Sequence, residues 1–417
     1  MIQRIGSVRG CFTMVHCATL LTLSLSAIIA WYGLSLADEP DSYAAARQKM
    51  VEDDIEREGI SNPAVLKALR QVPRHLFVSP EYRSKAYYDQ ALPIGHKQTI
   101  TPPYLVAYMT ALLDPQPSDR VLEIGTGCGY QAAVLSQIVK EVYSIEIIEA
   151  LGKQAAERLR ELGYTNVHVK IGDGYKGWPE QAPFDKIIVT CSPESVPQPL
   201  IDQLRDGGKM ILPLGERYQQ AFHLLEKRDG KLVQTRLVPT LFVPMTGKAE
   251  DLRKTKPDPL HPRIRNGGFE EQSDGQLDAW YHVRQTTIEQ GGAPEGKVYV
   301  TFANAEPGRT AGILQGIGVN GMRVKSLRLS LWVKAERAAV GDQATELPGL
   351  ALHFYDGESR PVGTSTMGPW LRSFHWKYVT AEVLVPPQAQ VAILSIGLNG
   401  GTGKLSVDDL KMVAKPR

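Results

Sequence analysis

Cysteine is scarce in this sequence. Four cysteines occur among 417 residues, and none follows Cys191. This count excludes a small scaffold held together by disulfides. Beyond the N-terminal region only Cys128 and Cys191 remain, and two separated cysteines make a poor zinc site, which usually needs four ligands. A disulfide between them is conceivable if the protein is exported from the cytoplasm. Two free cysteines that act as small hydrophobic residues are the simpler interpretation.

An excess of charge of one sign is also lacking. Lys and Arg number 47 against 45 Asp and Glu, a formal net charge of +2, and no long basic run occurs. This balance gives no support to a nucleic-acid partner. The sequence has no internal repeat and no low-complexity tract, which excludes a repeat architecture. Its length and its hydrophobic content of 43% fit a globular protein of two or three domains.

A long hydrophobic run occurs only near the N-terminus, at residues 18–36. Arg4 and Arg9 precede it, and small residues stand at the two positions that a signal peptidase reads. This order predicts that residues 1–37 are a secretory signal and that the protein is exported to the periplasm or envelope. N-terminal sequencing of the native protein would show whether cleavage follows Ala37.

Two alternatives to export stay open. The hydrophobic run is near spanning length, so residues 1–37 could be an uncleaved membrane anchor, the one case in which we expect contact with a membrane. Translation could instead start at Met50, which would leave the protein cytoplasmic.

Residues 41–246 have the pattern of an α/β domain. Two helices are expected first, at 44–58 and after Asn62-Pro63, followed by a loop at 72–98. Strands are then expected at 120–124, 142–145, 167–171, 186–190 and 209–212, and helices at 104–113, 130–139 and 149–162. This alternation predicts a parallel, doubly wound sheet. Asp229-Gly230 lies between two strand-like runs and predicts an antiparallel hairpin at the sheet edge.

The remaining chain has a different pattern. Residues 247–263 are polar and contain three prolines, which predicts a linker. From Ile264 onward the helical period disappears, and short runs of alternating apolar residues are separated by glycine and proline turns. Residues 264–417 are therefore expected to form an all-β sandwich or jelly roll.

The most informative local motif is VLEIGTGCGYQAAVL at 121–135, where a buried strand containing Glu123 meets a helix. Gly125, Gly127 and Gly129 allow a sharp turn and a close approach of the backbone to a ligand. Dinucleotide-binding and methyl-donor enzymes share this pattern, and a tight structural turn without a ligand is the alternative.

Acidic residues follow the next two strands. Glu146 ends the second strand, where a carboxylate can bond ribose hydroxyls, and Asp173, followed by Gly174, comes after the third, where an acid can face an adenine amine. Together with Glu123 and the glycines, these residues form the predicted cofactor site. The joint placement favours S-adenosylmethionine. NAD is the second choice, and the edge hairpin argues against it.

Beyond the glycine loop, the sequence resembles the protein-L-isoaspartate O-methyltransferase family from about residue 50 to 247. The resemblance rests on VPRHLFV (72–78), ALPIGHKQTITPPYLVA (91–107), GDGYKGWP (172–179), APFDKIIVT (182–190) and LFVPM (241–245). It implies the seven-stranded methyltransferase fold and S-adenosylmethionine as methyl donor. The implied substrates are L-isoaspartyl and D-aspartyl carboxylates in damaged proteins, whose methylation initiates repair.

The family has a functional serine after QTI, and Thr101 stands there in this sequence. Threonine keeps the hydroxyl but adds a methyl group and a stiffer χ1 angle. Thr101 is thus the candidate catalytic residue, orienting the attacking carboxylate together with backbone amides of 92–95. It could instead, or in addition, cap the helix that Pro102-Pro103 begin. No general base is required, because a carboxylate is already ionised at pH 7. His75 is expected to be structural.

The C-terminal region resembles galactose-binding-like jelly rolls, which include many carbohydrate-binding modules. The resemblance rests on NGGFE at 266–270, on Trp280 and on VDDL at 407–410. In such modules the two chain ends meet and often hold a structural calcium ion. Glu270 and Asp409 are candidate ligands, because carboxylates suit that ion; solvated edge carboxylates are the alternative.

Three tryptophans of this region could stack on a glycan. Trp332 lies in an apolar strand and is expected in the core, whereas Trp370 follows Gly368-Pro369 in a loop and is the better contact candidate; Trp376 is the third. The domain could equally be a packing or protein-binding module.

Three hypotheses for function follow. The first is an exported repair methyltransferase with the sandwich as targeting module. The second is an envelope binding protein whose methyltransferase domain has lost activity. The third is a methyltransferase for another carboxylate or hydroxyl. S-adenosylmethionine is a cytoplasmic metabolite, so its supply to an exported enzyme is an open question.

Overall fold

The computed structural model describes residues 42–417, and Ala46–Arg417 form one compact unit. The predicted signal peptide or membrane anchor at 1–37 lies outside these residues, so export stays a prediction of the sequence. In the part of the chain that is described, no helix combines the length and the apolar character needed to cross a membrane.

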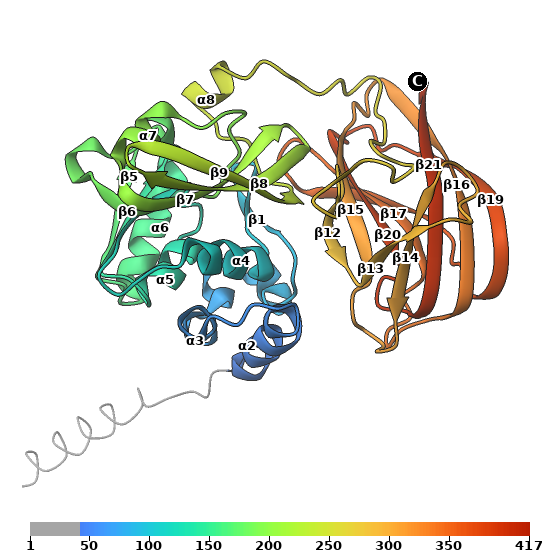
Figure 1. The fold of residues 1–417 in the computed structure, drawn as a ribbon, viewed down its shortest axis with the longest axis horizontal. Coiled ribbons are helices and arrows are strands. Elements are labelled where there is room, and N and C mark those ends of the chain that lie inside the picture. Colours follow the sequence, from blue (N-terminus) through green and yellow to red (C-terminus); the bar gives the residue numbers. More distant parts are fainter. Residues whose placement is uncertain (1–41) are drawn as a thin grey trace, which may run out of the picture. The chain divides into compact units, whose positions relative to one another are not determined.

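A seven-stranded mixed sheet forms the centre of the N-terminal domain, in the order β5-β4-β3-β6-β7-β8-β9 (Figure 1). Its strands are Arg120–Ile124 (β3), Glu141–Glu146 (β4), Val167–Ile171 (β5), Phe184–Val189 (β6), Leu204–Glu216 (β7), Gln219–Arg228 (β8) and Lys231–Thr240 (β9). Each neighbouring pair from β5 to β7 in this order is parallel. Strand β8 pairs antiparallel with both β7 and β9. The predicted edge hairpin is confirmed, with Asp229-Gly230 at its turn.

Helices flank this sheet. They are Ala44–Met50 (α2), Pro63–Gln71 (α3), Pro103–Leu113 (α4), Tyr130–Ser136 (α5), Glu149–Glu161 (α6), Gln198–Gln203 (α7) and Lys248–Asp251 (α8), with a π-helical turn at Val51–Glu56 (η1). Short 3-10 turns lie at Arg74–Phe77 (η2), Pro80–Lys85 (η3), Gly174–Lys176 (η4) and Pro179–Gln181 (η5). The predicted loop at 72–98 therefore contains local structure, including a small hairpin of Leu92–Gly95 (β1) and Gln98–Ile100 (β2).

Local signals decide where two of these helices begin. Asn62 caps α3, because its Oδ1 accepts hydrogen bonds from the backbone N–H groups of Ala64 and Val65. The predicted cap of α4 by Thr101 is wrong: Pro102 holds the cap position, and the side chain that bonds the first turn is Asp89, whose Oδ1 accepts from the N–H of Tyr104. Pro103, at the first helical position, has no N–H to satisfy. The hydroxyl of Thr101 thus has no role in starting this helix.

The central strands β3 and β6 are buried because helices and loops cover both faces of the sheet there, as in parallel sheets. Along β3, Val121 and Leu122 are fully buried and Ile124 is 2% exposed. Leu122 and Ile124 belong to one apolar core with Phe184 and Ile187 of β6, and each such side chain contributes roughly 1.5–3 kcal/mol on burial. This core holds the carboxyl ends of β3, β4 and β6 in fixed register.

Two five-stranded antiparallel sheets form the C-terminal domain, so the predicted β-sandwich is present (Figure 1). The first has the order β12-β15-β20-β17-β18, with strands Tyr281–Arg284, Gly312–Gly318, Val391–Gly397, Gly349–Tyr355 and Pro361–Met367. The second has the order β13-β14-β21-β16-β19, with strands Thr286–Gln290, Val298–Asn304, Thr402–Pro416, Val324–Ala339 and Arg372–Leu384. A small hairpin, Gln272–Ser273 (β10) and Gln276–Leu277 (β11), precedes them. A large apolar core fills the space between the sheets.

The motif residues that suggested this domain hold its two ends together. The backbone N–H of Leu410 donates to the carbonyl of Gly267, and the indole N–H of Trp280 donates to the carbonyl of Asn266. Phe269 and Trp280 are fully buried. These residues are therefore explained by packing.

The predicted linker at 247–263 begins too early. Residues 248–251 form helix α8, and the guanidinium group of Arg253 is buried against the N-terminal domain. It donates to the carbonyls of Ser192 and Gly215 and pairs with Glu250. The polar composition of this segment hides these tertiary bonds, which is why the sequence suggested a linker.

Two tryptophan predictions were wrong. Trp370 is 8% exposed and packs in the sandwich core. Trp332 lies outside that core, half-buried, with its ring edge-on to Tyr378. The neighbours of Trp332 along β16, Leu331 and Val333, are fully buried, so strand alternation directs the tryptophan outward. Trp376 is also half-buried and packs on Tyr299.

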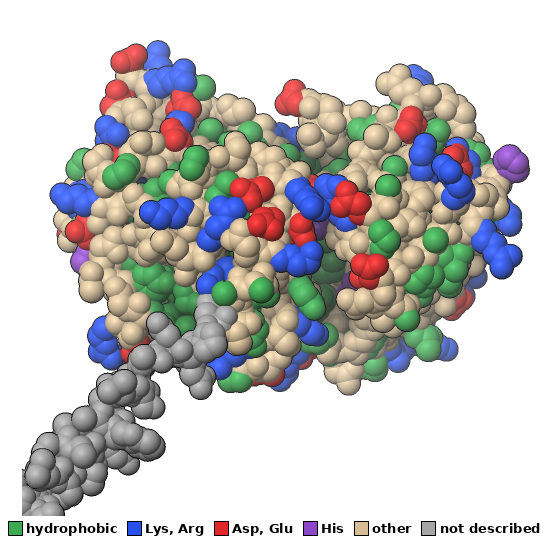
Figure 2. Space-filling view, turned by 90° about the horizontal axis from the view of Figure 1, so that it is seen from below, with side chains coloured by type: hydrophobic (Ala, Val, Ile, Leu, Met, Phe, Trp, Pro, Cys, Tyr) green, Lys and Arg blue, Asp and Glu red, His purple; other side chains and the backbone are tan. Residues whose placement is uncertain are grey.

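Charged side chains of both signs are interspersed on the face shown in Figure 2. No large patch of Lys and Arg alone gathers on that face, in agreement with the net charge of +2.

Candidate functional site

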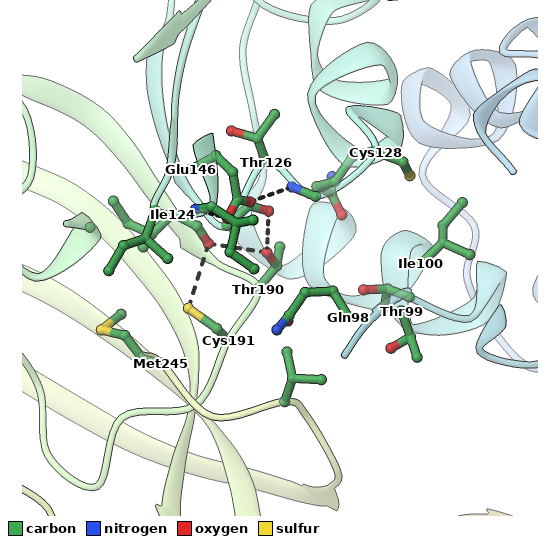
Figure 3. A pocket seen from close by; sticks show the side chains of 18 of the residues that line it. Gln98, Thr99, Ile100, Ile124, Thr126, Cys128, Glu146, Thr190, Cys191 and Met245 are labelled. Carbon is green, nitrogen blue, oxygen red and sulfur yellow. Dashed lines mark hydrogen bonds between the residues drawn. The ribbon is translucent and has the colours of Figure 1, made fainter. Parts of the chain in front are cut away.

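A pocket lies at the point where the strand order of the N-terminal sheet reverses. The chain runs from β3 outward through β4 to β5, then returns to place β6 on the other side of β3. Ligands of open α/β sheets bind at such a switch point, beyond the carboxyl ends of the strands. The pocket is lined there by segments that follow β3 (124–128), β4 (145–148) and β6 (190–191) (Figure 3).

The glycine loop has a conformation that glycine alone adopts without strain. Gly125, Gly127 and Gly129 have φ angles of +98°, +55° and +92°. A Cβ atom on Gly125 would lie 2.6 Å from Oγ1 of Thr190, and one on Gly127 would lie 3.2 Å from Cδ1 of Ile94. Gly125 and Gly127 line the pocket, while Gly129 stands at the N-terminus of α5 and packs against Leu159. The loop therefore leaves open backbone beside the pocket.

Glu146 holds this loop in place. Its Oε2 accepts a hydrogen bond of 2.8 Å from the backbone N–H of Gly127, and its Oε1 accepts one of 2.9 Å from the N–H of Ile148. The side chain lines the pocket and is 5% exposed. Each carboxylate oxygen has further lone pairs, so the same group can accept from ribose hydroxyls. Ile147, next in the chain, is 37% exposed and offers an apolar surface for a base.

Glu123 lies beneath the loop and not among the residues that line the pocket. It is fully buried, and its Oε2 accepts from the hydroxyl of Ser144, which also bonds Thr126 in the glycine loop. Burial raises the pKa of this carboxyl to about 8, and the nearby Glu146 also raises it. A neutral Glu123 thus supports the loop from below, which corrects its predicted role in direct cofactor contact.

We expect Glu123→Gln to raise the free energy of unfolding near pH 8 and to leave it almost unchanged near pH 4.5. The folded chain retains a proton on Glu123 up to a pKa of about 8, whereas the unfolded chain releases it near 4.5. The wild type therefore loses stability as the pH rises between these values, and glutamine cannot ionise. The gain should be about 1–3 kcal/mol at the upper end. Denaturant unfolding of both proteins at pH 5 and pH 8 checks it; a difference independent of pH would contradict it.

Asp173 has backbone partners that the sequence did not show, and its predicted contact with adenine stays a prediction. Its Oδ1 accepts from the N–H of Tyr175 and its Oδ2 from the N–H of Lys248, so it joins the end of β5 to helix α8. It lines a neighbouring depression, while Gly174 lines the pocket itself. A Cβ on Gly174 would lie 2.3 Å from Cγ2 of Ile124, so only glycine fits there.

Several residues that line the pocket were not predicted as site residues from the sequence. Thr190 donates from Oγ1 to the carbonyls of Ile124 and Gly125 and so ties β6 to the glycine loop. Cys191, Pro244 and Met245 form another side of the pocket. Position after a strand end is the signal that could have found Thr190 and Cys191. The far wall at 243–246 comes close only through tertiary pairing, in which the N–H of Met245 donates to the carbonyl of Ser192.

Cys128 and Cys191 are both free and both line the pocket. Burial raises the pKa of each thiol, so both are protonated at neutral pH. They act as small apolar groups beside the site, as the simpler interpretation of the sequence had it. His75 is buried elsewhere and hydrogen-bonds the hydroxyl of Tyr87 through Nδ1.

Thr101 stands where the pocket opens into a larger cleft. Three residues of its segment, Gln98, Thr99 and Thr101, line both spaces, and so does Thr190. Thr101 is half-buried, and no group in residues 42–417 forms a hydrogen bond with its hydroxyl. The hydroxyl is thus available to a ligand that enters from the cleft.

The candidate calcium ligands have other partners. Oε1 of Glu270 accepts from the N–H groups of Lys297 and Val298, and Asp409 pairs with Lys411. Residues 42–417 contain no group of three or more His, Cys, Asp or Glu that could hold a metal ion. The calcium prediction has no support in these side chains.

A glycine loop at the switch point, a strand-end carboxylate and a sheet closed by an antiparallel hairpin define the class of S-adenosylmethionine-dependent methyltransferases. The sequence matches the family described as protein-L-isoaspartate(D-aspartate) O-methyltransferase over residues 45–250. It is 49% identical to the protein-L-isoaspartate O-methyltransferase of Opitutus terrae over 225 residues, which cover 54% of this chain and 97% of that protein. The chain belongs to this family.

A second curated relative agrees. The protein-L-isoaspartate O-methyltransferase of a Picosynechococcus species is 49% identical over 207 residues, covering 50% of this chain and 93% of that protein. A crystal structure of a putative protein-L-isoaspartate O-methyltransferase from Plasmodium falciparum in complex with S-adenosyl-L-homocysteine is 24% identical. It covers 48% of this chain and 98% of that chain, with a TM-score of 0.43. The family match ends at residue 250, and the C-terminal sandwich lies beyond it.

Proposed function

We propose that this chain transfers a methyl group from S-adenosylmethionine to the free carboxylate of L-isoaspartyl and D-aspartyl residues in damaged proteins, which initiates repair. Family membership supports the reaction. The observation that carries the assignment to this site is the position of Thr101, at the opening between the cofactor pocket and the larger cleft.

The pocket residues fit the proposed donor. Gly125 and Gly127 present backbone without a Cβ, the carboxylate of Glu146 is held in place for ribose hydroxyls, and Ile147 gives apolar contact. When bound, S-adenosylmethionine supplies an electrophilic methyl group on a positively charged sulfur. Cys191 and Met245 make the neighbouring wall apolar and restrict water.

The protein's own part in the reaction is mainly positioning. The substrate carboxylate is ionised at neutral pH and needs no base to activate it. Thr101 can donate its hydroxyl hydrogen to one oxygen of this carboxylate and leave the other free to attack. The hairpin β1–β2 carries Thr101, and Pro102 and Pro103 restrict the backbone that follows.

The test is methyl transfer from labelled S-adenosylmethionine to an isoaspartyl peptide, with the normal aspartyl peptide as control. The wild type should methylate only the first. We expect Thr101→Ala to lower kcat/KM about 10- to 100-fold, since a hydrogen bond to a charged group contributes about 1.5–3 kcal/mol. Thr101→Ser should retain most activity, because the hydroxyl remains.

Each outcome has a clear meaning. Unchanged turnover in Thr101→Ala would remove this residue from the mechanism and leave the reaction assigned. A wild type that binds the donor but methylates neither peptide would favour a binding protein that has lost activity, or a methyltransferase for another substrate. Calcium and glycan binding form no part of the proposal.

A further inference from the structure

One sheet of the sandwich has an outer face unlike a solvent-exposed surface. Across the central strands β15, β20 and β17 the outward rows are Leu314–Ser395–Ala351, Gly316–Ile393–His353 and Gly318–Val391–Tyr355. These positions, called here the uncharged face, carry no Lys, Arg, Asp or Glu. The outer face of the other sheet carries Arg328, Glu382 and Lys411. A sheet face exposed to water normally carries polar side chains, so something covers the uncharged face.

The N-terminal domain covers part of it. A Cβ on Gly316 would lie 3.1 Å from Cδ2 of Leu241 and 3.2 Å from Cδ1 of Tyr218, so glycine permits this close approach. Most of the other positions of the uncharged face, including Ile393 and Ser395, line the same cleft as Thr101. The cleft thus has the Thr101 segment on one side and the sandwich on the other.

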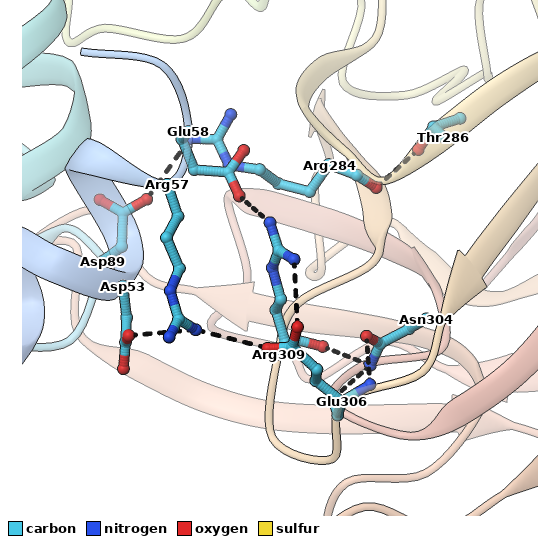
Figure 4. Close-up of polar contacts among 9 residues, drawn as sticks. All are labelled: Asp53, Arg57, Glu58, Asp89, Arg284, Thr286, Asn304, Glu306 and Arg309. Carbon is cyan, nitrogen blue, oxygen red and sulfur yellow. Dashed lines mark hydrogen bonds and ion pairs between the residues drawn. The ribbon is translucent and has the colours of Figure 1, made fainter. Parts of the chain in front are cut away.

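Polar contacts hold the sandwich against residues 57–58 and Asp89 of the N-terminal domain (Figure 4). The guanidinium carbon of Arg284 lies 3.8 Å from the ring centre of Tyr104, and its nitrogens lie 3.6 Å from Glu58 and 3.7 Å from Asp89. Asp89 in turn accepts from the N–H of Tyr104, in the first turn of α4. Arg284 therefore contacts the helix that follows Thr101 directly.

A second contact lies on the other side of the Thr101 segment. The hydroxyl of Ser359, in the turn between β17 and β18, donates to the carbonyl of Lys97, and Lys97 pairs with Glu358 at 3.4 Å. Lys97 is in the turn of the β1–β2 hairpin that carries Thr101. The sandwich is thus attached to both ends of the segment that presents the catalytic hydroxyl.

Residues that line the cleft also carry polar atoms without a partner. The hydroxyls of Tyr281 and Thr240 and the Nε of Arg217 are buried and form no hydrogen bond within residues 42–417. Tyr281 is 8% exposed and Thr240 is 2% exposed. Unpaired buried polar groups are costly, and the hydroxyl of Tyr281 lies beside Gly316, in the part of the uncharged face that the N-terminal domain covers.

We propose that the uncharged face is the second wall of the substrate groove, and that the groove takes an extended, unfolded segment of polypeptide around the isoaspartyl residue. The apolar side chains of this wall, Ile393 and Val391, contact apolar neighbours of the damaged residue. A folded domain cannot enter between two walls, whereas an extended chain can. The sandwich thereby selects unfolded substrates. This inference rests on the proposed methyltransferase function.

The experiment places the same substitution on the two outer faces of the sandwich. Val391→Lys puts a charge on the uncharged face, and Val413→Lys, at a residue 61% exposed on the other sheet, is the matched control. Ile393→Ala is a milder second variant, in case the charge prevents folding. The readouts are kcat and KM for a long isoaspartyl peptide with apolar neighbours, the Kd of S-adenosylhomocysteine by calorimetry, and the Tm.

We expect Val391→Lys to raise the peptide KM about tenfold, and Ile393→Ala about threefold, with kcat and the Kd of S-adenosylhomocysteine within twofold of wild type. Val413→Lys should match the wild type. The wild type should also methylate an isoaspartyl protein much faster when it is unfolded than when it is folded.

Equal peptide KM values in Val391→Lys, Ile393→Ala and Val413→Lys would overturn the proposal, and so would equal rates on folded and unfolded protein. Competition by a soluble oligosaccharide, with no effect of Val391→Lys on the peptide KM, would assign the wall to a glycan and overturn it as well. A wild type that methylates no isoaspartyl peptide at all is a different result, because it contradicts the proposed function itself.

Discussion

Glu146→Ala is expected to weaken the binding of S-adenosylmethionine roughly 100-fold, or about 2.7 kcal/mol. The variant loses the acceptor for ribose hydroxyls. It also frees the N–H groups of Gly127 and Ile148, which Glu146 now holds at 2.8 and 2.9 Å. The glycine loop then has to be ordered when the donor binds, and this ordering lowers the affinity further. Isothermal calorimetry with the donor and with S-adenosylhomocysteine measures the change.

Glu149→Ala is the matched control for this prediction. Glu149 stands three positions further along the chain, its side chain is 67% exposed, and it pairs with Lys153 on the surface of α6. Surface pairs of this kind contribute less than about 1 kcal/mol, so the control should bind the donor like the wild type. Donor affinity within threefold of wild type in Glu146→Ala would show that the pocket is not the donor site.

Gly125→Ala is expected to lower the free energy of unfolding by about 3 kcal/mol and donor affinity at least tenfold. Alanine at a φ of +98° costs about 1–2 kcal/mol by itself. The new Cβ would also lie 2.6 Å from Oγ1 of Thr190, which would have to give up its bonds to the carbonyls of Ile124 and Gly125. Denaturant unfolding and calorimetry measure the two effects.

Gly163→Ala separates the backbone strain at positive φ from the steric contact with Thr190. Gly163 has a similar φ of +80°, but a Cβ there meets nothing within 4 Å. In this control the free energy of unfolding should fall by only about 1–2 kcal/mol, and the donor affinity should be unchanged. If both variants lose the same stability and neither loses donor affinity, the steric contact with Thr190 is unimportant and the tight packing of the glycine loop on β6 has no functional role.

Strand alternation shows how much more the sequence could have revealed. Trp332 was expected in the core because its strand is apolar, yet it shares the phase of Arg328 and Lys334, whereas Leu329, Leu331 and Val333 are fully buried. The alternation of side chains along the strand would have placed this ring outside the core. No such count applies to Trp370, since it follows Gly368-Pro369 and enters the core through the packing of a loop.

The sequence by itself determined the two domains, the parallel sheet with its edge hairpin, and the glycine loop with Glu146 at the next strand end. These features depend on local periodicity and on positive φ angles, which a short stretch of chain encodes. It also supplied the family resemblance, through motifs around Thr101.

Only the tertiary structure decided which of these groups face the pocket. It placed Glu123 below the loop, turned Asp173 toward Lys248, and brought residues 243–246 against β6. It also placed the uncharged face of the sandwich opposite Thr101. Burial and contact between segments that are separated in the sequence depend on how whole layers pack, and no local pattern contains that information.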